Sequence, residues 1–457
     1  MVNIFLAIVS GALLSGAFAP LTMWWLAPIA LALHIFTLKR CEHPFLNSFI
    51  FALVFNAIAL HWTSTFVGSI PWTILALGQA TLFIPLGFAH KYGVALYPFI
   101  FLLLEQLRGS FPFGGFGWMR IAYSQADAPY RSIAAIGGAA GLSALVLCIS
   151  LTLSALFNAR VHVIAILPLL LLLIPIHSNS IGVVRVLMVQ GDVPALGLDF
   201  NSRAKAVFIN HVNETKKALA FDNNVDFILW PENAVDVDPF TNSDVKTTLN
   251  SFTTPLIIGA VIREKGSLQN VSILWRNEVK ETYVKQHLTP FGEYIPMRSL
   301  ASKISPLVGS VEDFSPGSSS KIFEIAPAKI APIICFELID DRILSTAAQE
   351  SNLLVVQTNS ATFGFSPESA QQLEISRIRA IEHGRNTLSV STTGISAVID
   401  RTGAVTARTQ IHQPAHIFAS VQLLDSQTPR DRAGNWATAA AFLWLLILGI
   451  VSRRLSS

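Results

Sequence analysis

Charged residues are spread very unevenly along this chain of 457 residues. Only ten Lys, Arg, Asp or Glu residues lie between positions 1 and 177, whereas 51 lie in the rest of the chain. Long stretches with almost no charge suit a bilayer, where a helix satisfies its own backbone hydrogen bonds. The sequence therefore predicts a lipid-facing part, residues 1–177, followed by a water-facing domain.

Eight apolar runs are candidates for membrane-spanning helices. Seven lie in the first part and one near the C-terminus: 4–19, 23–38, 46–66, 72–89, 94–107, 133–157, 161–176 and 436–451. A span takes about 20 mainly apolar residues, which most runs reach once their flanks are included. The run 94–107 is the weakest, because Glu105 and Gln106 lie near its end; Glu105 is either functional or reaches the interface. We expect a multi-pass α-helical membrane domain of about eight spans, the last within 431–457 and followed by a short cytoplasmic tail.

The distribution of cationic residues predicts the orientation of these spans. Ala17-Phe18-Ala19 resembles a signal-peptide cleavage site, but no Lys or Arg precedes the first run and six more runs follow it. If the N-terminus is inside, the inner loops carry Lys39, Arg40, Lys91, Arg160, Arg453 and Arg454. The outer loops 20–23 and 67–71 carry no Lys or Arg, although Arg108, Arg120 and Arg131 lie on a long, Gly-rich outer segment that could dip back toward the membrane. The positive-inside rule then places both termini in the cytoplasm and the water-facing domain, residues 178–430, outside it.

Composition excludes several classes of function. No basic block indicates nucleic-acid binding, and no repeat of fixed period is present. The three cysteines form no Cys-x-x-Cys pair, so neither a disulfide framework nor a zinc site is expected. Cys41 and Cys148 lie in or beside apolar stretches, where a thiol acts as a small hydrophobic group. We expect no metal and no cofactor.

The water-facing domain alternates short β-rich runs with helical, charged segments. Strands are predicted at 183–189, 225–229, 256–261, 329–334, 353–357 and 396–400, and helices at 202–220 and 369–385. Near-continuous apolar strands are typical of sheets covered on both faces. The pattern predicts a layered α/β domain.

Three of the predicted strand ends carry residues with catalytic chemistry. Glu232 follows Trp230-Pro231, Lys285 and Glu293 bracket a Pro-Phe-Gly turn, and Cys335 ends a β-branched run and precedes Glu337. A thiol attacks as its thiolate, which a nearby ammonium and a carboxylate base favour. The three segments are too far apart in sequence for local contact, so they meet only if the sheets bring the strand ends together.

Each of these residues also has a purely structural interpretation. A free cysteine is commonly a buried core residue, and Glu232 with Lys285 could form a surface ion pair. Glu293 and Glu337 could each cap a helix or pair with Arg377. His287, in Lys-Gln-His-Leu, is more readily explained as a packing or hydrogen-bonding residue than as a base.

Taken together, Trp-Pro-Glu, Lys with the following Leu-x-Pro-Phe-Gly-Glu-Tyr, and Ile-Cys-Phe-Glu resemble the nitrilase superfamily. With the membrane part, nearly the whole chain resembles the apolipoprotein N-acyltransferase family of the bacterial plasma membrane. The resemblance implies an αββα sandwich and a catalytic triad of Glu232, Lys285 and Cys335, supported by Glu293 and Glu337. It also implies a monomeric acyltransferase with two lipid-tailed partners, a phospholipid donor and an S-diacylglyceryl lipoprotein acceptor.

The reaction that the resemblance implies has two steps. An acyl chain moves from a phospholipid to Cys335 as a thioester and then to the α-amino group of the lipidated N-terminal cysteine of the lipoprotein. Lys285 would stabilise the oxyanion with a backbone N–H near the turn after Cys335, and Glu232 would move the protons. The alternatives are a membrane-tethered amidase that hydrolyses a C–N bond and a non-catalytic transporter or scaffold.

Two departures from the family pattern affect this expectation. Phe336 follows the cysteine where the family usually has Tyr, so a hydroxyl is missing there. Residues 359–363 read Asn-Ser-Ala-Thr-Phe where the family often reads Asn-Asp-Ala-Trp-Phe, so an acid and a tryptophan are absent. Apolar loops at 363–365, 307–309 and 111–118 are candidates for lipid contact, although ordinary packing explains them equally well.

Overall fold

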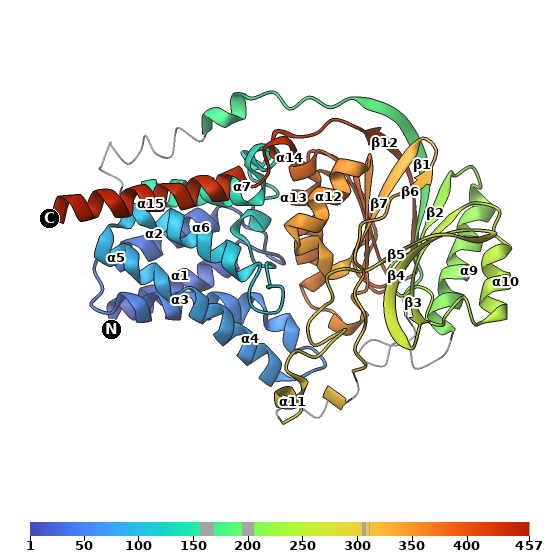
Figure 1. The fold of residues 1–457 in the computed structure, drawn as a ribbon, viewed down its shortest axis with the longest axis horizontal. Helices are drawn as coiled ribbons and strands as arrows, with labels where there is room; N and C mark the ends of the chain where they lie inside the picture. The colour runs from blue at the N-terminus through green and yellow to red at the C-terminus, as the bar shows by residue number, and fades with distance from the viewer. Residues whose placement is uncertain (156–168, 194–204, 304–307, 310, 457) are drawn as a thin grey trace. The chain divides into compact units, whose positions relative to one another are not determined.

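The computed structural model describes residues 1–155, 169–193, 205–303, 308–309 and 311–456, and these residues form two compact units (Figure 1). The first unit combines Met1–His177 with Gln427–Ser457, and the second is Ser178–Ser426. The first half of the predicted span 161–176, the start of the predicted helix 202–220 and Leu307 lie outside the described residues. The two units are described separately.

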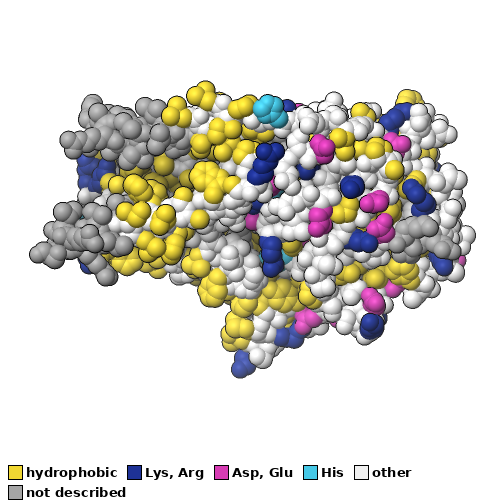
Figure 2. All heavy atoms as spheres, turned by 45° about the horizontal axis from the view of Figure 1, so that its top comes forward, with side chains coloured by type: hydrophobic (Ala, Val, Ile, Leu, Met, Phe, Trp, Pro, Cys, Tyr) yellow, Lys and Arg dark blue, Asp and Glu magenta, His cyan; other side chains and the backbone are white. Residues whose placement is uncertain are grey.

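The first unit is helical. Its helices are α1 (Val2–Ser15), α2 (Leu26–Leu38), α3 (Pro44–Ala59), α4 (Ser69–Leu82), α5 (Phe88–Tyr92), α6 (Tyr97–Arg108), α7 (Ala134–Ser154), α14 (Pro429–Ala433) and α15 (Trp436–Ser456). On the face drawn in Figure 2, hydrophobic side chains dominate the surface of this unit, and charged side chains gather on the second unit. This contrast follows the uneven charge of the sequence.

Two helical stretches of the first unit, Ser69–Tyr92 and Arg131–Ser154, are long and apolar enough to cross a membrane. The other apolar stretches are shorter: Val2–Ser15, Leu26–Leu38, Pro44–Ala59 and, within α15, the part Trp436–Ile447. The 14 residues of α1 extend about 21 Å, less than the roughly 30 Å of a bilayer core. Eight full-length spans are therefore not confirmed, because several helices stop before their apolar runs end.

The C-terminal helix α15 packs against α7 although most of the chain lies between them in sequence. The indole Nε1 of Trp436 donates a hydrogen bond to the carbonyl oxygen of Ile136 at 2.8 Å. Gly137 leaves room for the Trp436 ring, since an added Cβ would lie 3.4 Å from its Cζ2 atom. The indole hydrogen bond and the contact of the Trp436 ring with Gly137 thus join the two helices.

Glu105 is fully buried and does not reach an interface. Its Oε1 accepts a hydrogen bond from the backbone N–H of Ile121 at 2.6 Å. One turn further along α6, the guanidinium of Arg108 donates to the carbonyl oxygen of Met119. Together these two side chains hold the segment between α6 and residue 121 against the helix.

The second unit is a four-layered α/β domain. One sheet has the order β12-β1-β2-β3-β4-β5 and the other β11-β10-β9-β8-β7-β6. The strands are β1 (Ser180–Gln190), β2 (Phe227–Leu229), β3 (Leu256–Glu264), β4 (Ser267–Arg276), β5 (Glu278–Val284), β6 (Phe323–Ile325), β7 (Ala328–Ile334), β8 (Leu353–Thr358), β9 (Thr387–Ser391), β10 (Ala397–Ile399), β11 (Val405–Arg408) and β12 (Ala415–Leu424). Its helices are α9 (Ala206–Phe221), α10 (Ser243–Asn250), α11 (Arg298–Ala301), α12 (Asp341–Glu350) and α13 (Glu368–His383). All six predicted strands and both predicted helices are present, with shifted ends.

Strand alternation explains the layers. In β1, Val186 and Met188 enter the core between the two sheets, whereas Leu187 and Val189 pack with residues of α9. Successive side chains of a strand point to opposite faces, so an apolar strand supplies both cores. Figure 1 shows α9 and α10 outside the first sheet and α12 and α13 outside the second. The predicted αββα sandwich is confirmed.

Candidate active site

Cys335 lies at a strained turn between β7 and a short 3₁₀ helix, Cys335–Ile339. Its φ of +49° is in the left-handed region, which costs a residue with a Cβ about 1–2 kcal/mol. The side chain is partly exposed and packs against the core between the sheets. Strain of this kind persists only where the surrounding structure enforces it, as at reactive sites.

Lys285 follows β5 and is enclosed by two carboxylates. Its side chain is 1% exposed, and Nζ lies 2.8 Å from Glu293 Oε2 and 3.4 Å from Glu232 Oε1. The amide Nδ2 of Asn270, on β4, donates to Glu232 Oε1 at 2.8 Å and to Glu293 Oε1 at 2.7 Å. We call these four residues, Glu232, Asn270, Lys285 and Glu293, the lysine side of the thiol.

The electrostatics of the lysine side keep a cation next to the thiol. Burial alone would lower the pKa of Lys285, but Glu293 and Glu232 outweigh burial and raise it. Burial likewise raises the pKa of Glu293, yet Lys285 and hydrogen bonds from Thr289 and Asn270 bring it below its ordinary value. Lys285 therefore stays protonated and Glu293 ionised throughout the neutral range.

The thiol and Glu232 have the opposite tendency. Burial raises the pKa of Glu232, and Lys285 opposes this rise. Burial also raises the pKa of the Cys335 thiol well above its ordinary value; Glu232 adds to the rise and Lys285 opposes it. The thiol lies within hydrogen-bonding reach of Glu232. The resting site thus favours a protonated thiol, with the Glu232 carboxyl within reach of its proton.

Close packing and cross-sheet contacts fix the position of Glu232. A Cβ added to Gly259 in β3 would lie 2.4 Å from the carbonyl oxygen of Pro231 and 2.6 Å from the Cα of Glu232. Only glycine allows this approach. From the second sheet, the Gln357 amide donates to the Trp230 carbonyl oxygen at 2.7 Å. The two sheets are therefore joined next to the predicted base.

The Glu337 carboxylate accepts hydrogen bonds from backbone N–H groups and a tyrosine hydroxyl, and it forms no ion pair with Lys285 among the described contacts. It is fully buried, and Oε2 accepts from the N–H of Ile334 at 2.8 Å. Oε1 accepts from the Tyr283 hydroxyl at 2.7 Å and from the N–H of Gln286 at 2.6 Å. These bonds join the turn at Cys335 to the segment that carries Lys285. Arg377, the alternative partner for either carboxylate, is bound to Glu374 at 2.9 Å.

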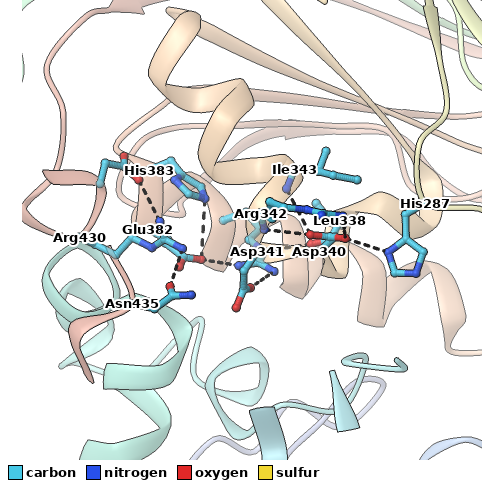
Figure 3. A network of polar contacts seen from close by, with 12 residues as sticks. His287, Leu338, Asp340, Asp341, Arg342, Ile343, Glu382, His383, Arg430 and Asn435 are labelled. Atoms are coloured by element: carbon cyan, nitrogen blue, oxygen red, sulfur yellow. Dashed lines mark hydrogen bonds and ion pairs between the residues drawn. The ribbon is translucent and has the colours of Figure 1, made fainter. Parts of the chain in front are cut away.

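His287 is held by Asp340, as Figure 3 shows. Its Nδ1 lies 3.1 Å from Asp340 Oδ2, while Asp340 Oδ1 accepts from the backbone N–H of Arg342 at 2.9 Å and of Ile343 at 3.2 Å at the start of α12. The His287 ring meets Phe336 edge to face, with centroids 5.1 Å apart. His287 is thus a packing and hydrogen-bonding residue, and Phe336 fills the place where the family usually has Tyr.

The other side of the thiol is formed by α13 and the preceding loop. Gln372 Nε2 lies 3.7 Å from Cys335 Sγ. Glu368, one helical turn earlier, is 2% exposed and interacts electrostatically with Cys335 and Glu232. The Ser360 side chain lies against the Glu368 carboxyl and favours its ionised form. We call Ser360, Glu368 and Gln372 the glutamine side.

The loop with the altered family pattern is well anchored. The Asn359 side-chain oxygen accepts from the Thr392 hydroxyl at 2.6 Å and from the N–H of Ala361 at 3.1 Å. Phe365 is 77% exposed, with its ring 4.0 Å from that of His412. Of the candidate lipid-contact loops, residues 363–365 thus present an aromatic ring to the surroundings, and 111–118 expose Phe111 and Phe113 in the first unit.

The structure brings Glu232, Lys285, Glu293 and Cys335 together and places Glu337 behind the cysteine turn. Sequence reasoning missed Asn270, Glu368 and Gln372. Asn270 precedes an apolar run in β4, and Gln372 lies among the apolar positions of α13. A buried amide in such a position needs partners, so these two residues carried a signal that could have been read.

Two segments match known families. Residues 10–152 match the family described as apolipoprotein N-acyltransferase N-terminal domain, and residues 203–430 match the carbon-nitrogen hydrolase family. A CN-hydrolase superfamily structure from Xanthomonas campestris covers 53% of this chain and 91% of its own at 14% identity and a TM-score of 0.40, too weak a likeness to support a further step.

Curated relatives match nearly the whole chain. The apolipoprotein N-acyltransferase of Mycolicibacterium smegmatis is 33% identical over 97% of this chain and 83% of its own length. That of Photobacterium profundum is 26% identical over 98% of this chain and 95% of its own. The chain therefore belongs to the apolipoprotein N-acyltransferase family.

Proposed function

We propose that this chain moves a fatty acyl group from a phospholipid to Cys335 and then to the α-amino group of the lipidated N-terminal cysteine of a lipoprotein. Membership of the N-acyltransferase family supports the reaction class. One observation supports the route through Cys335: the thiol faces a buried Lys285 that is held between Glu232 and Glu293. This arrangement provides a nucleophile, a base and a fixed cation in one place.

In the first step, Glu232 takes the thiol proton as Sγ attacks the ester carbonyl carbon. The S–C bond forms, and the negative charge on the carbonyl oxygen is stabilised by Lys285, which remains a cation. The C–O bond to the glycerol backbone then breaks, and Glu232 returns the proton to the leaving oxygen. A lysophospholipid leaves, and the acyl group remains on Cys335 as a thioester.

In the second step, the acceptor amine attacks the thioester carbon. The C–N bond forms, the C–S bond breaks, and Glu232 passes a proton from the nitrogen to the departing sulfur. Because the thiol is protonated at rest, each cycle begins and ends with the same charge on Cys335. We assign the second substrate to the glutamine side, whose three residues include no cation.

The membrane arrangement follows from the location of both substrates. We assign seven transmembrane helices to residues 1–177, an extracytoplasmic catalytic domain to 178–430, and a last span with a short cytoplasmic tail to 431–457. Two long apolar helices, the apolar surface of the first unit and the positive-inside pattern support this arrangement. The enzyme would act as a monomer in the bacterial plasma membrane, on a phospholipid and an S-diacylglyceryl lipoprotein.

Mass spectrometry of the purified chain incubated with phospholipid vesicles tests this function. An acyl adduct on Cys335 is expected, and a diacylglyceryl peptide with a free amine should discharge it. The Cys148→Ala variant should retain the adduct and serves as the control. Equal discharge by water alone would instead identify a membrane-tethered amidase, and the absence of an adduct from an active preparation would rule out the thioester route.

A further inference from the structure

The second step has one proton more than the lysine side can accept. An α-amino group has an ordinary pKa of about 7.7–8.0, so at neutral pH it arrives mainly as an ammonium. It must lose one proton before it attacks and a second as the amide forms. Glu232 and the departing sulfur of Cys335 account for only one of these protons. A second acceptor is needed close to the thioester.

Glu293 is poorly suited to this task. Its carboxylate accepts from Lys285 Nζ at 2.8 Å, from Asn270 Nδ2 at 2.7 Å and from the Thr289 N–H at 2.7 Å. Hydrogen bonds to the charged form make a carboxylate a weak base. Glu337 is likewise occupied by backbone N–H groups and a hydroxyl. Neither carboxylate offers a strongly basic oxygen to the acceptor amine.

Glu368 has the geometry that the others lack. It is 2% exposed, and among the described residues its Oε2 has no hydrogen-bond partner. Glu368 and Gln372 are four residues apart on α13 and therefore share a helix face. Gln372 lies 3.7 Å from the sulfur of Cys335, and Cys335 and Glu232 both interact with the Glu368 charge. A buried oxygen without a hydrogen-bond partner among the described residues is thus present near the thiol, on the helix face that also carries Gln372.

We propose that Glu368 binds the α-ammonium of the acceptor and takes its proton, which frees the amine to attack the thioester on Cys335. The N–H bond breaks, the O–H bond forms on the Glu368 carboxylate, and the proton leaves to solvent after the product departs. This proposal rests on the proposed function. It makes Glu368 a catalytic residue of the second step alone.

The electrostatic setting of Glu368 agrees with this role. Burial raises the pKa of Glu368 to about 8, with Ser360 opposing the rise and the charge of Glu232 adding to it. This value is close to that of an α-amino group, so a proton passes between them at little cost. The groups that shift the pKa of Glu368 include no cation, whereas Lys285 lowers the pKa of Glu293. The substrate ammonium can therefore be the positive partner of Glu368.

The same contacts connect Glu368 to the altered loop. Ser360 stands where the family pattern places Asp, and Ser360 lies against the Glu368 carboxyl. An acidic group that this loop lacks is therefore supplied next to Ser360 by α13. We infer that the loop and the start of α13 together form the amine subsite.

Glu368→Gln tests the proposal because it keeps the shape of the side chain and removes its basic oxygen. Thioester formation on Cys335 should proceed at the wild-type rate, whereas discharge by a diacylglyceryl peptide at neutral pH should fall about 10²-fold. The deficit should shrink as the pH rises above the pKa of the amine. Hydroxylamine, which is uncharged at neutral pH, should discharge both proteins equally. Glu374→Gln, on the same helix but paired with Arg377, is the matched control and should behave as wild type.

The two half-reactions separate failure of this proposal from failure of the proposed function. If no thioester forms on the wild-type chain, the function itself is wrong. If the thioester forms but Glu368→Gln discharges the peptide as fast as wild type, Glu368 takes no proton from the amine. An equal loss with hydroxylamine and with the peptide would show a structural role instead and would also overturn the proposal.

Discussion

The two sides of the thiol differ in how their buried acids are compensated. On the lysine side, Glu232 and Glu293 share the cation of Lys285 and the amide of Asn270. On the glutamine side, Glu368 is as deeply buried but has only neutral neighbours in Ser360 and Gln372 and the like charge of Glu232. An isolated buried carboxyl is costly in its ionised form, so Glu368 favours its protonated form until the substrate ammonium arrives and favours the carboxylate.

This difference explains how one thiol can take part in two chemically distinct steps, thioester formation and transfer to the amine. The paired acids keep fixed charges, which suits stabilisation of the oxyanion in both half-reactions. The unpaired acid changes its protonation near neutral pH, which suits a substrate that brings its own positive charge. The six substitutions that follow separate these two environments.

Cys335→Ala should have the largest effect, because both sides act on this sulfur. Loss of a covalent nucleophile typically lowers turnover by about 10⁶-fold. The fold should be retained, since the strained backbone at position 335 needs no particular side chain. Adduct formation and the far-ultraviolet circular dichroism of the variant measure the two expectations, and residual turnover above a tenth of wild type would contradict the first.

Glu232→Gln should lower the rate of thioester formation by about 10²–10⁴-fold. The base acts only as a carboxylate, so the wild-type rate should fall as the pH drops through the raised pKa of Glu232, above its ordinary value. The amide cannot titrate, so the variant should lack this acid limb. Single-turnover rates from acidic to neutral pH measure it, and an unchanged profile would assign the base to another residue.

Gly259→Ala should lower the same rate by about 10²-fold, since a displacement of about 1 Å is enough for such a loss. The new Cβ would lie 2.4 Å from the Pro231 carbonyl oxygen and must push the Glu232 backbone away. Gly78→Ala, which meets nothing within 4 Å, is the matched control. Thioester formation and hydroxylamine discharge should both slow, because Glu232 moves a proton in each step, whereas the far-ultraviolet circular dichroism should be unchanged; a changed spectrum would indicate general unfolding.

Glu293→Gln and Glu337→Gln should separate two acids that are alike in sequence. Removal of the Glu293 charge should cost the transition state about 1.4 kcal/mol, or tenfold in rate, because Lys285 loses its nearest partner. Glu337→Gln turns an amide toward backbone N–H groups and should lower the free energy of unfolding by about 1–3 kcal/mol. Chemical denaturation measures the stability of each variant, and single-turnover kinetics measures its rate. A larger rate loss in Glu337→Gln and a larger stability loss in Glu293→Gln would contradict the assignment.

Gln372→Leu should have the smallest effect. A hydrogen bond to sulfur at 3.7 Å is weak, and its loss is worth about 1 kcal/mol, or a few-fold in the rate of thioester formation. Peptide discharge should change by no more than this, because Glu368 remains. If Gln372→Leu slowed peptide discharge as much as Glu368→Gln does, the Gln372 amide rather than the Glu368 carboxyl would be the group that acts on the amine.

Part of this site could be predicted from residues alone and part could not. Glu232, Lys285 and Cys335 follow apolar strands and carry reactive groups, so local pattern was sufficient to single them out. Glu293 and Glu337 look equivalent in sequence, since each follows a strand end with an aromatic residue nearby. Only the partners that the fold supplies, a cation for one and backbone N–H groups for the other, distinguish them.

The amino-acid sequence by itself determined the division of the chain, the apolar strands of the sandwich and the identity of the reactive thiol, because charge density and residue alternation are local properties. The tertiary structure decided where the apolar runs of the first unit stop being helical, and it placed Asn270, Gln372 and Glu368 around the sulfur. It also decided that the thiol is protonated at rest. These outcomes depend on burial and on distances between segments remote in sequence, and both arise only when the two sheets and α13 pack together.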